Sequence, residues 1–416
     1  MDIFLITAPG LEGLLADEAR ERGFSVIETI PGGVTVTGDW PDVWRANLTL
    51  RGATRVLARI GEFRAMHLAQ LDKRSKKFPW GDVIPQGATV KVEATCRKSK
   101  IYHAGAAQQR VEDALKHHGA TISKTAEFSV RVRIEDDLVT FSLDTSGESL
   151  HKRGHKEAVN KAPMRETLAS LFLRGCGYDG NEPVYDPMCG SRTFPIEAAE
   201  IARAMDAGRS RGFAFQDLAS YDATAFDALR SPPQETVHRF YGTDRDAGAI
   251  RMCQANADRA GVTEQTDFQM KPISDITPPC TNKGLIIANP PYGGRIGNKK
   301  PLYGLYASLG ERLKKEFKGW RVGIITSEQS LAKATGLPFK PVGPVVNHGG
   351  IKIRLWQTDT PLTPHALDPA GELRDFGGGA VTSHFTRNYS IHRHHMPRRR
   401  ARKIPKTTYY MSLINH

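Results

Sequence analysis

The chain has 416 residues, 39% of them hydrophobic and 8% aromatic, which favours two or three globular domains over a disordered chain. No stretch approaches the roughly 18 consecutive apolar residues of a membrane helix, and the first residues lack a secretory signal, so we expect a cytoplasmic protein without membrane contact. Five widely spaced cysteines without a C-x-x-C pair argue against disulfides and a metal site, whereas a formal net charge of +13 favours a polyanionic partner.

The first 54 residues predict a small α+β unit. Apolar runs indicate strands, and a helical pattern opens after Pro9-Gly10 and stops at Gly23. The expected strands are 3–6, 24–30 and 34–37. One helix is expected to begin at Leu11, and a second is expected at 40–48.

Residues 55–150 predict a second α+β unit with one basic face. Its expected strands are 56–63, 89–95, 128–134 and 138–143, and its expected helices are 68–78 and 106–118. Basic residues are frequent in the middle of this unit: Lys73, Arg74, Lys76, Lys77, Arg97, Lys98 and Lys100.

Residues 151–162 are polar and basic and are interpreted as a linker, and residues 163–360 then alternate strands with helices. This alternation predicts a doubly wound, Rossmann-like α/β sheet. A tight pair of strands at 342–346 and 351–355 is a hairpin, so one late strand must be antiparallel to the others. We expect 209–234 to be a surface insertion and 361–416 a basic C-terminal extension.

The first candidate site is the turn from Asp186 to Thr193, where a strand gives way to a helix expected at 194–207. A glycine in such a turn allows the backbone to approach a cofactor closely. The turn contains neither the Gly-Lys-Ser/Thr of a Walker loop nor a full G-x-G-x-x-G.

The second candidate is Asp244, at the end of the next strand. A carboxylate in this position can accept hydrogen bonds from both hydroxyls of a ribose. Asp246, two residues later, is interpreted as the N-cap of the following helix.

The most specific signal is the tetrapeptide Asn289-Pro290-Pro291-Tyr292 at the end of an apolar strand. Two prolines stiffen the backbone and remove two amide donors. The Asn289 side chain and the Pro290 carbonyl then provide two acceptors, which match the two hydrogens of an exocyclic amino group. The ring of Tyr292 can stack on a planar base.

With these motifs the chain resembles class I amino-methyltransferases, and in particular the THUMP-domain RNA methyltransferases that modify guanine N2 in large-subunit ribosomal RNA. The resemblance extends to about residue 358. It includes Asp144-Thr145-Ser146-Gly147, His151-Lys152-Arg153-Gly154 and Ala162-Pro163-Met164-Arg165-Glu166 near the junction. It implies a ferredoxin-like part at 1–54, a THUMP RNA-binding domain at 55–150 and a methyltransferase domain at 163–360.

The resemblance also implies S-adenosylmethionine as the cofactor and assigns roles to matching residues. Asn289, Pro290 and Tyr292 would hold the target base. The implied cofactor-binding residues are Asp186, Met188, Cys189, Gly190, Ser191, Thr193, Asp244, Asp275 and Asn289. One position departs from the family: Arg192 stands where a second glycine is usual, so we expect weaker cofactor binding unless its side chain points outward.

The expected reaction is methylation of the exocyclic N2 of a guanine, with 23S ribosomal RNA as the expected partner. Transfer RNA as the substrate, or a non-catalytic RNA-binding or assembly role with a cofactor loop impaired by Arg192, stays open as an alternative. A DNA adenine-N6 methyltransferase and a protein glutamine methyltransferase share the tetrapeptide, but the basic N-terminal region disfavours both.

Overall fold

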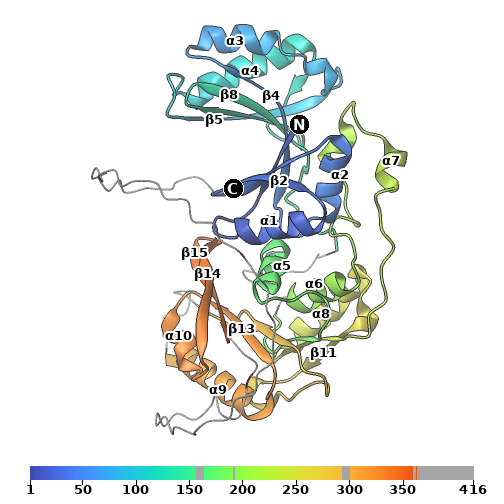
Figure 1. The fold of residues 1–416 in the computed structure, drawn as a ribbon, viewed down its shortest axis with the longest axis vertical. Coiled ribbons are helices and arrows are strands. Elements are labelled where there is room, and N and C mark those ends of the chain that lie inside the picture. The colour runs from blue at the N-terminus through green and yellow to red at the C-terminus, as the bar shows by residue number, and fades with distance from the viewer. Residues whose placement is uncertain (156–163, 191–192, 293–299, 359–361, 363–416) are drawn as a thin grey trace, which may run out of the picture. The chain divides into compact units, whose positions relative to one another are not determined.

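The computed structural model describes residues 1–155, 164–190, 193–292, 300–358 and 362. The strands of the first 150 residues form one sheet, and those between residues 184 and 358 form another (Figure 1). Within the described residues, none of the helices has both the length and the apolar character of a membrane span.

The N-terminal sheet has eight strands in the order β2-β3-β1-β4-β8-β7-β5-β6. The strands are β1 (Asp2–Ile6), β2 (Ser25–Ile30), β3 (Gly33–Thr37), β4 (Arg55–Arg64), β5 (Thr89–Arg97), β6 (Thr121–Ile122), β7 (Ser129–Glu135) and β8 (Leu138–Asp144). Strand β4 pairs antiparallel with both β1 and β8, so the sheet continues across the predicted division at residue 54.

Four helices accompany this sheet: α1 (Glu12–Glu21), α2 (Trp40–Thr49), α3 (Leu68–Lys76) and α4 (Ala104–His118). Helix α4 ends where Gly119 adopts a φ of 103°, a left-handed conformation that glycine accepts without steric cost. Figure 1 shows α3 and α4 on the same face of β4, β5 and β8. The opposite face of these strands carries charged side chains in ion pairs, including Arg131 with Glu93 and Asp144.

The second sheet has seven strands in the order β11-β10-β9-β12-β13-β15-β14. They are β9 (Val184–Asp186), β10 (Phe240–Asp244), β11 (Thr266–Met270), β12 (Leu285–Ala288), β13 (Arg321–Thr326), β14 (Phe339–His348) and β15 (Ile351–Thr358). The first five run parallel, whereas β15 is antiparallel to both β13 and β14. The predicted Rossmann-like sheet with an antiparallel last strand is therefore confirmed.

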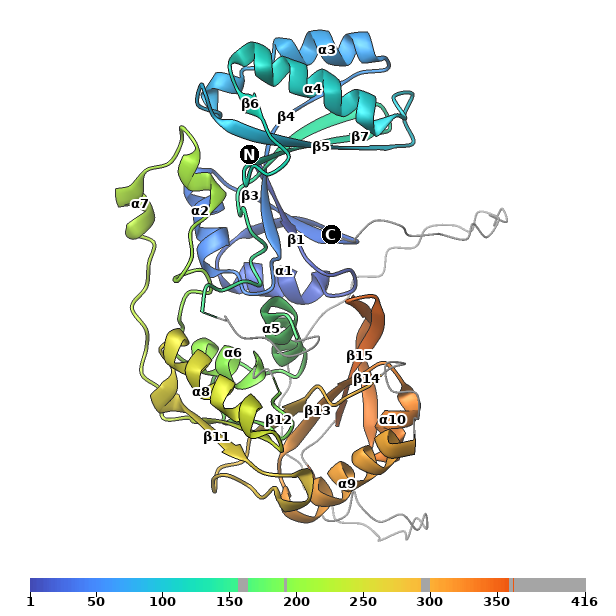
Figure 2. The ribbon, with the colours of Figure 1, turned by 180° about the vertical axis from the view of Figure 1, so that it is seen from behind.

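Helices cover both faces of this sheet (Figure 2). They are α5 (Glu166–Gly175), α6 (Thr193–Ala202), α8 (Ala247–Ala260), α9 (Lys300–Glu316) and α10 (Gln329–Ala334). Side chains on β12 alternate between the two faces, as the pleat requires. Leu285 and Ile287 pack in the core with residues of α5, α6 and α8, whereas Ile286 packs with Leu309 of α9.

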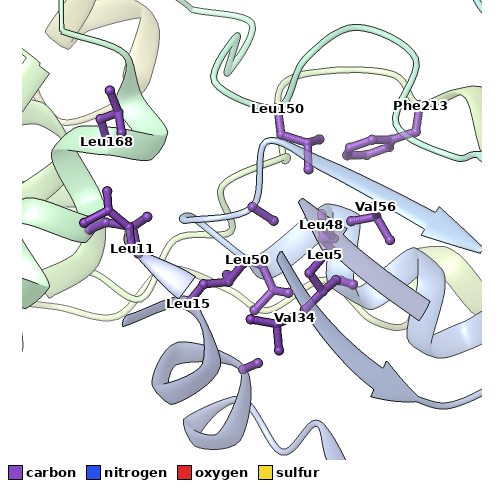
Figure 3. Close-up of a cluster of buried hydrophobic side chains, with 14 of the residues drawn as sticks. Leu5, Leu11, Leu15, Val34, Leu48, Leu50, Val56, Leu150, Leu168 and Phe213 are labelled. Atoms are coloured by element: carbon purple, nitrogen blue, oxygen red, sulfur yellow. The ribbon is translucent and has the colours of Figure 1, made fainter. Parts of the chain in front are cut away.

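The N-terminal sheet and the second sheet share one hydrophobic core cluster. Leu11, just before α1, and Leu15 of α1 lie in the same cluster as Leu168 of α5 (Figure 3). Beside this apolar contact, Arg174 of α5 forms a double hydrogen bond with Glu21 of α1 at 2.7 and 2.6 Å.

Two sequence-based expectations are corrected here. The segment 209–234, expected to be a surface insertion, contains the short helix α7 (Ala223–Asp227) and buries Phe215 and Phe226, and Phe215 stacks against Trp44 of α2. Helix α6 was predicted to reach residue 207 but ends at Ala202, because Ala204 adopts a left-handed φ of 49°.

Candidate cofactor and target-base site

The predicted site residues lie at the carboxyl ends of adjacent parallel strands. Asp186 ends β9, Asp244 ends β10 and Asn289 directly follows β12, and β9 pairs with both of its neighbours. This edge is the switch point where the strand order reverses, the place where open α/β sheets bind ligands. Asp275 lies farther along, in the short 3-10 helix Ile273–Asp275, with its side chain exposed.

The turn after β9 is held by hydrogen bonds from its own backbone. The amide of Met188 donates to Oδ1 of Asp186 at 3.0 Å, and the amide of Cys189 donates to the carbonyl of Thr243 at 2.9 Å. Gly190 has a φ of 40°, in the left-handed region, so glycine suits this position. The turn therefore presents backbone groups, and not a bulky side chain, at Gly190.

Asp244 fastens the same turn to the second strand. Its Oδ2 accepts from the amide of Gly190 at 3.0 Å, and its Oδ1 accepts from the amide of Asp246 at 3.0 Å. Each carboxylate oxygen can accept more than one hydrogen bond, so acceptor capacity remains for a ligand's hydroxyl groups. The predicted N-cap role of Asp246 is confirmed, because its Oδ1 accepts from the amide of Gly248 at 2.8 Å.

Other predicted cofactor residues have different surroundings. Cys189 is buried, with its Sγ 3.6 Å from the Sγ of Cys253 on α8. The hydroxyl of Thr193 donates to the carbonyl of Met164 at 3.0 Å and so secures the start of α6. Oδ1 of Asp275 accepts from the hydroxyl of Ser274 at 2.8 Å. Ser191 and Arg192 lie outside the described residues.

Burial, opposed by a backbone hydrogen bond from Met188 and aided by the neighbouring carboxylate of Asp244, raises the pKa of Asp186 to about 8. An ionised carboxylate with so little compensation is costly to bury, and it would be stabilised by a cationic ligand group.

This shift predicts a pH-dependent stability. The folded state holds a proton on Asp186 up to about pH 8, whereas the unfolded chain releases it near the ordinary value of 3.8, so stability falls as pH rises between these values. Relative to Asp186→Asn, the wild type is expected to lose on the order of 1 kcal/mol of unfolding free energy per pH unit between pH 6 and 8. Denaturant unfolding of both proteins across this range checks it, and parallel pH profiles would contradict it.

Asn289 carries the most informative polar atom of the site. Its Oδ1 is buried and has no hydrogen-bond partner among the described residues. Burial, opposed by a hydrogen bond with the Asn289 side chain, raises the pKa of Tyr292 to about 12. Since buried polar atoms are normally paired, the unpaired oxygen of Asn289 is a candidate acceptor for a ligand's donor.

A buried tyrosine that the sequence motifs did not identify supports this loop. The hydroxyl of Tyr306, on α9, donates to the carbonyl of Pro291 at 3.4 Å, and the side chain of Tyr306 is fully buried. The helical pattern around Tyr306 predicts burial, but no sequence signal identifies the carbonyl that it contacts.

Two family models match parts of the chain. A family model described as an RMKL-like methyltransferase domain matches residues 153–341, and a model described as an RlmL ferredoxin-like domain matches residues 2–57. The second match agrees with the ferredoxin-like part expected at 1–54.

Two curated relatives cover most of the chain. The chain is 33% identical over 380 residues to a ribosomal RNA large subunit methyltransferase K/L of Syntrophotalea carbinolica, covering 86% of this chain and 53% of the relative. It is 30% identical over 366 residues to a putative RNA methyltransferase of Synechocystis, covering 85% of this chain and 95% of the relative. The chain thus spans about half the length of the K/L relatives.

Two solved structures have similar folds. A possible methylase from Clostridium difficile has a TM-score of 0.77 and 31% identity, covering 86% of this chain and 98% of its own. A putative methyltransferase, SMU.472, in complex with SAH has a TM-score of 0.76 and 26% identity, covering 86% and 97%.

Proposed function

The chain belongs to the RMKL-like methyltransferase family, and from this premise we propose that it transfers a methyl group from S-adenosylmethionine to the exocyclic N2 of a guanine in large-subunit ribosomal RNA. The observation that carries the proposal is the buried, unpaired Oδ1 of Asn289 beside Pro290 and Tyr292. An acceptor in this position suits an amino group on a flat ring, and no second polar partner has to be displaced.

The residues at the strand ends fit the proposed cofactor. The partly exposed carboxylate of Asp244 retains acceptor capacity for two ribose hydroxyls. Asp186 is a buried carboxyl group suited to the cationic methionine end, and Gly190 allows close approach of the backbone. When bound, S-adenosylmethionine supplies an electrophilic methyl group on a sulfonium.

The chain's own groups prepare the target nitrogen. An aromatic amine is a poor nucleophile because its lone pair is delocalised into the ring. Oδ1 of Asn289 and the carbonyl of Pro290 would accept hydrogen bonds from its two N–H groups, which would direct the lone pair toward the methyl group of a bound cofactor. The N–C bond forms as the C–S bond breaks, and the amine's extra proton then leaves to solvent. The base must leave its stack to reach this position, and stacking on Tyr292 compensates in part.

We propose that the N-terminal sheet contacts the RNA backbone on the face that α3 covers, within a THUMP-type domain at residues 55–150. Lys73 and Lys77 are exposed and make no ion pair within the described residues. Cations on the opposite, open face of the sheet are neutralised instead, as Arg133 is by Glu135. Unpaired lysines keep their full charge for phosphates.

The double variant Lys73→Ala/Lys77→Ala is therefore expected to bind RNA more weakly regardless of sequence. The slope of log affinity against log salt should decrease in magnitude by about 1.5 to 2, because each phosphate contact releases condensed counterions. Filter binding across salt measures it. Arg133→Ala is the matched control and should leave the slope unchanged, and an unchanged slope in the double variant would place the RNA elsewhere.

The proposed activity is tested by methyl transfer from labelled S-adenosylmethionine to three separate substrates: unmodified large-subunit ribosomal RNA, unmodified transfer RNA and duplex DNA. We expect incorporation into ribosomal RNA alone. Preference for transfer RNA would redirect the substrate assignment, and preference for DNA would overturn the RNA assignment. Binding of S-adenosylhomocysteine without transfer to any of them would favour a non-catalytic role.

A further inference from the structure

A cluster of buried charges connects the N-terminal segment to helix α6. Arg51 lies between α2 and β4, and its side chain is only 4% exposed. Its Nη1 lies 2.9 Å from Oε2 of Glu197 and 2.9 Å from Oε2 of Glu200. The two glutamates occupy successive turns of α6 and are fully buried.

Two further arginines and a histidine belong to the cluster, and Nε2 of the buried His155 lies 3.5 Å from Oε1 of Glu200. Arg153 donates from Nε to Oε1 of Glu197 at 3.0 Å, and from Nη2 to the backbone carbonyl of Arg51 at 2.9 Å. Arg209 donates to Oε1 of Glu200 at 2.6 Å. Each carboxylate thus binds two arginines. Burial alone would raise the pKa of Glu200, but Arg51, Arg209 and His155 lower it to about 2, so this carboxylate is ionised.

The position of this cluster relates it to the cofactor turn. Helix α6 begins at Thr193, three residues after Gly190, and it packs against β9 and β10, the strands that end at Asp186 and Asp244. Arg51 holds the helix at two points, because its guanidinium bridges Glu197 and Glu200. It also donates to the carbonyl of Met205, just after the helix. A planar guanidinium with several fixed donors imposes geometry that a single ion pair does not.

We propose that Arg51 is a positioning residue for cofactor binding. Through Glu197 and Glu200 it fixes the placement of α6, and through α6 it fixes the turn Asp186–Gly190. Arg51 lies outside the matched methyltransferase domain, so part of the cofactor site's geometry is set by the N-terminal region. The inference rests on the proposed function, since it takes this turn as the place where S-adenosylmethionine binds.

Calorimetric titration of the full chain with S-adenosylhomocysteine tests the inference. Arg51→Met removes the bridge, and its affinity is expected to fall roughly tenfold. Arg51→Lys keeps the charge but cannot bridge both carboxylates and the Met205 carbonyl, so an intermediate loss of about threefold is expected. In turnover assays the loss should appear in the KM for S-adenosylmethionine, with kcat at saturation changed less than about twofold.

Arg174→Met is the matched control. Arg174 also joins the N-terminal region to the second sheet's helices, but its guanidinium pairs with Glu21 of α1 and, within the described residues, forms no hydrogen bond or ion pair with α6. We expect its affinity to equal that of the wild type. Wild-type affinity in Arg51→Met, or in Arg51→Lys if the methionine variant does not fold, overturns the inference, as does an equal loss in Arg174→Met. A wild-type chain that does not bind S-adenosylhomocysteine overturns the proposed function as well.

Discussion

Replacing Asn289 with alanine is expected to reduce the rate of methyl transfer by about 10²–10³-fold at saturating cofactor, because one of the two acceptors that orient the target amine is lost. The Oδ1 of Asn289 is buried and has no hydrogen-bond partner among the described residues, so removing this oxygen breaks no hydrogen bond with them. Single-turnover transfer to RNA is the measurement, because it reports the chemical step and not product release.

Two comparisons make this prediction specific. Asn289→Asp keeps an acceptor at the same place and should lose only about tenfold in rate. Binding of S-adenosylhomocysteine should change less than about twofold in both variants if Asn289 acts chiefly on the base. A rate in Asn289→Ala within a few-fold of the wild type would exclude the amide from the role proposed here.

Replacing Asp244 with alanine is expected to weaken S-adenosylhomocysteine binding by roughly 10²-fold, which corresponds to about 2.7 kcal/mol. Two hydrogen bonds from ribose hydroxyls to a carboxylate account for this magnitude, at about 1.5 kcal/mol or more each. The variant also removes the acceptor of the Gly190 amide, which holds the cofactor turn against the second strand. Isothermal titration of the folded variant measures the affinity.

Asp246→Ala provides the matched control two residues away. Asp246 caps α8 through the amide of Gly248, so its loss should lower stability by about 1 kcal/mol. Its side chain does not bond the cofactor turn in the described structure, and the affinity should stay near the wild-type value. Equal losses of affinity in the two variants would mean that the helix start, and not the ribose contact, explains the effect.

Local signals in the sequence predicted much of the second sheet. Helix α8 begins directly after its predicted N-cap, Asp246, and ends before Gly261, and strand β12 ends directly before Asn289-Pro290, as the sequence predicted. Strand β11 was not predicted, since Thr266–Met270 has little apolar periodicity and lies at the edge of the sheet. Motif spacing also identified the acidic strand ends, whose positions at one edge follow from the parallel order.

The buried ionic cluster could not be predicted in the same way. Arg51 and Glu197 are 146 residues apart, and an arginine in a sequence is normally expected to lie at the surface. The predicted linker at 151–162 illustrates the difficulty, because its described part buries Arg153 and His155. A charged residue indicates exposure by default, and only the long-range pairing reverses that. Two glutamates three apart within the apolar helix α6 were the one local signal.

The proposed methylation of guanine N2 is tested by identifying the nucleoside that receives the methyl group. Large-subunit ribosomal RNA is incubated with the full chain and S-adenosylmethionine carrying a deuterated methyl group. The RNA is then digested to nucleosides, which are identified by mass spectrometry. We expect label in N2-methylguanosine with the wild type and loss of that label with Asn289→Ala. Label in N6-methyladenosine, or no labelled nucleoside from a chain that binds S-adenosylhomocysteine, would contradict it.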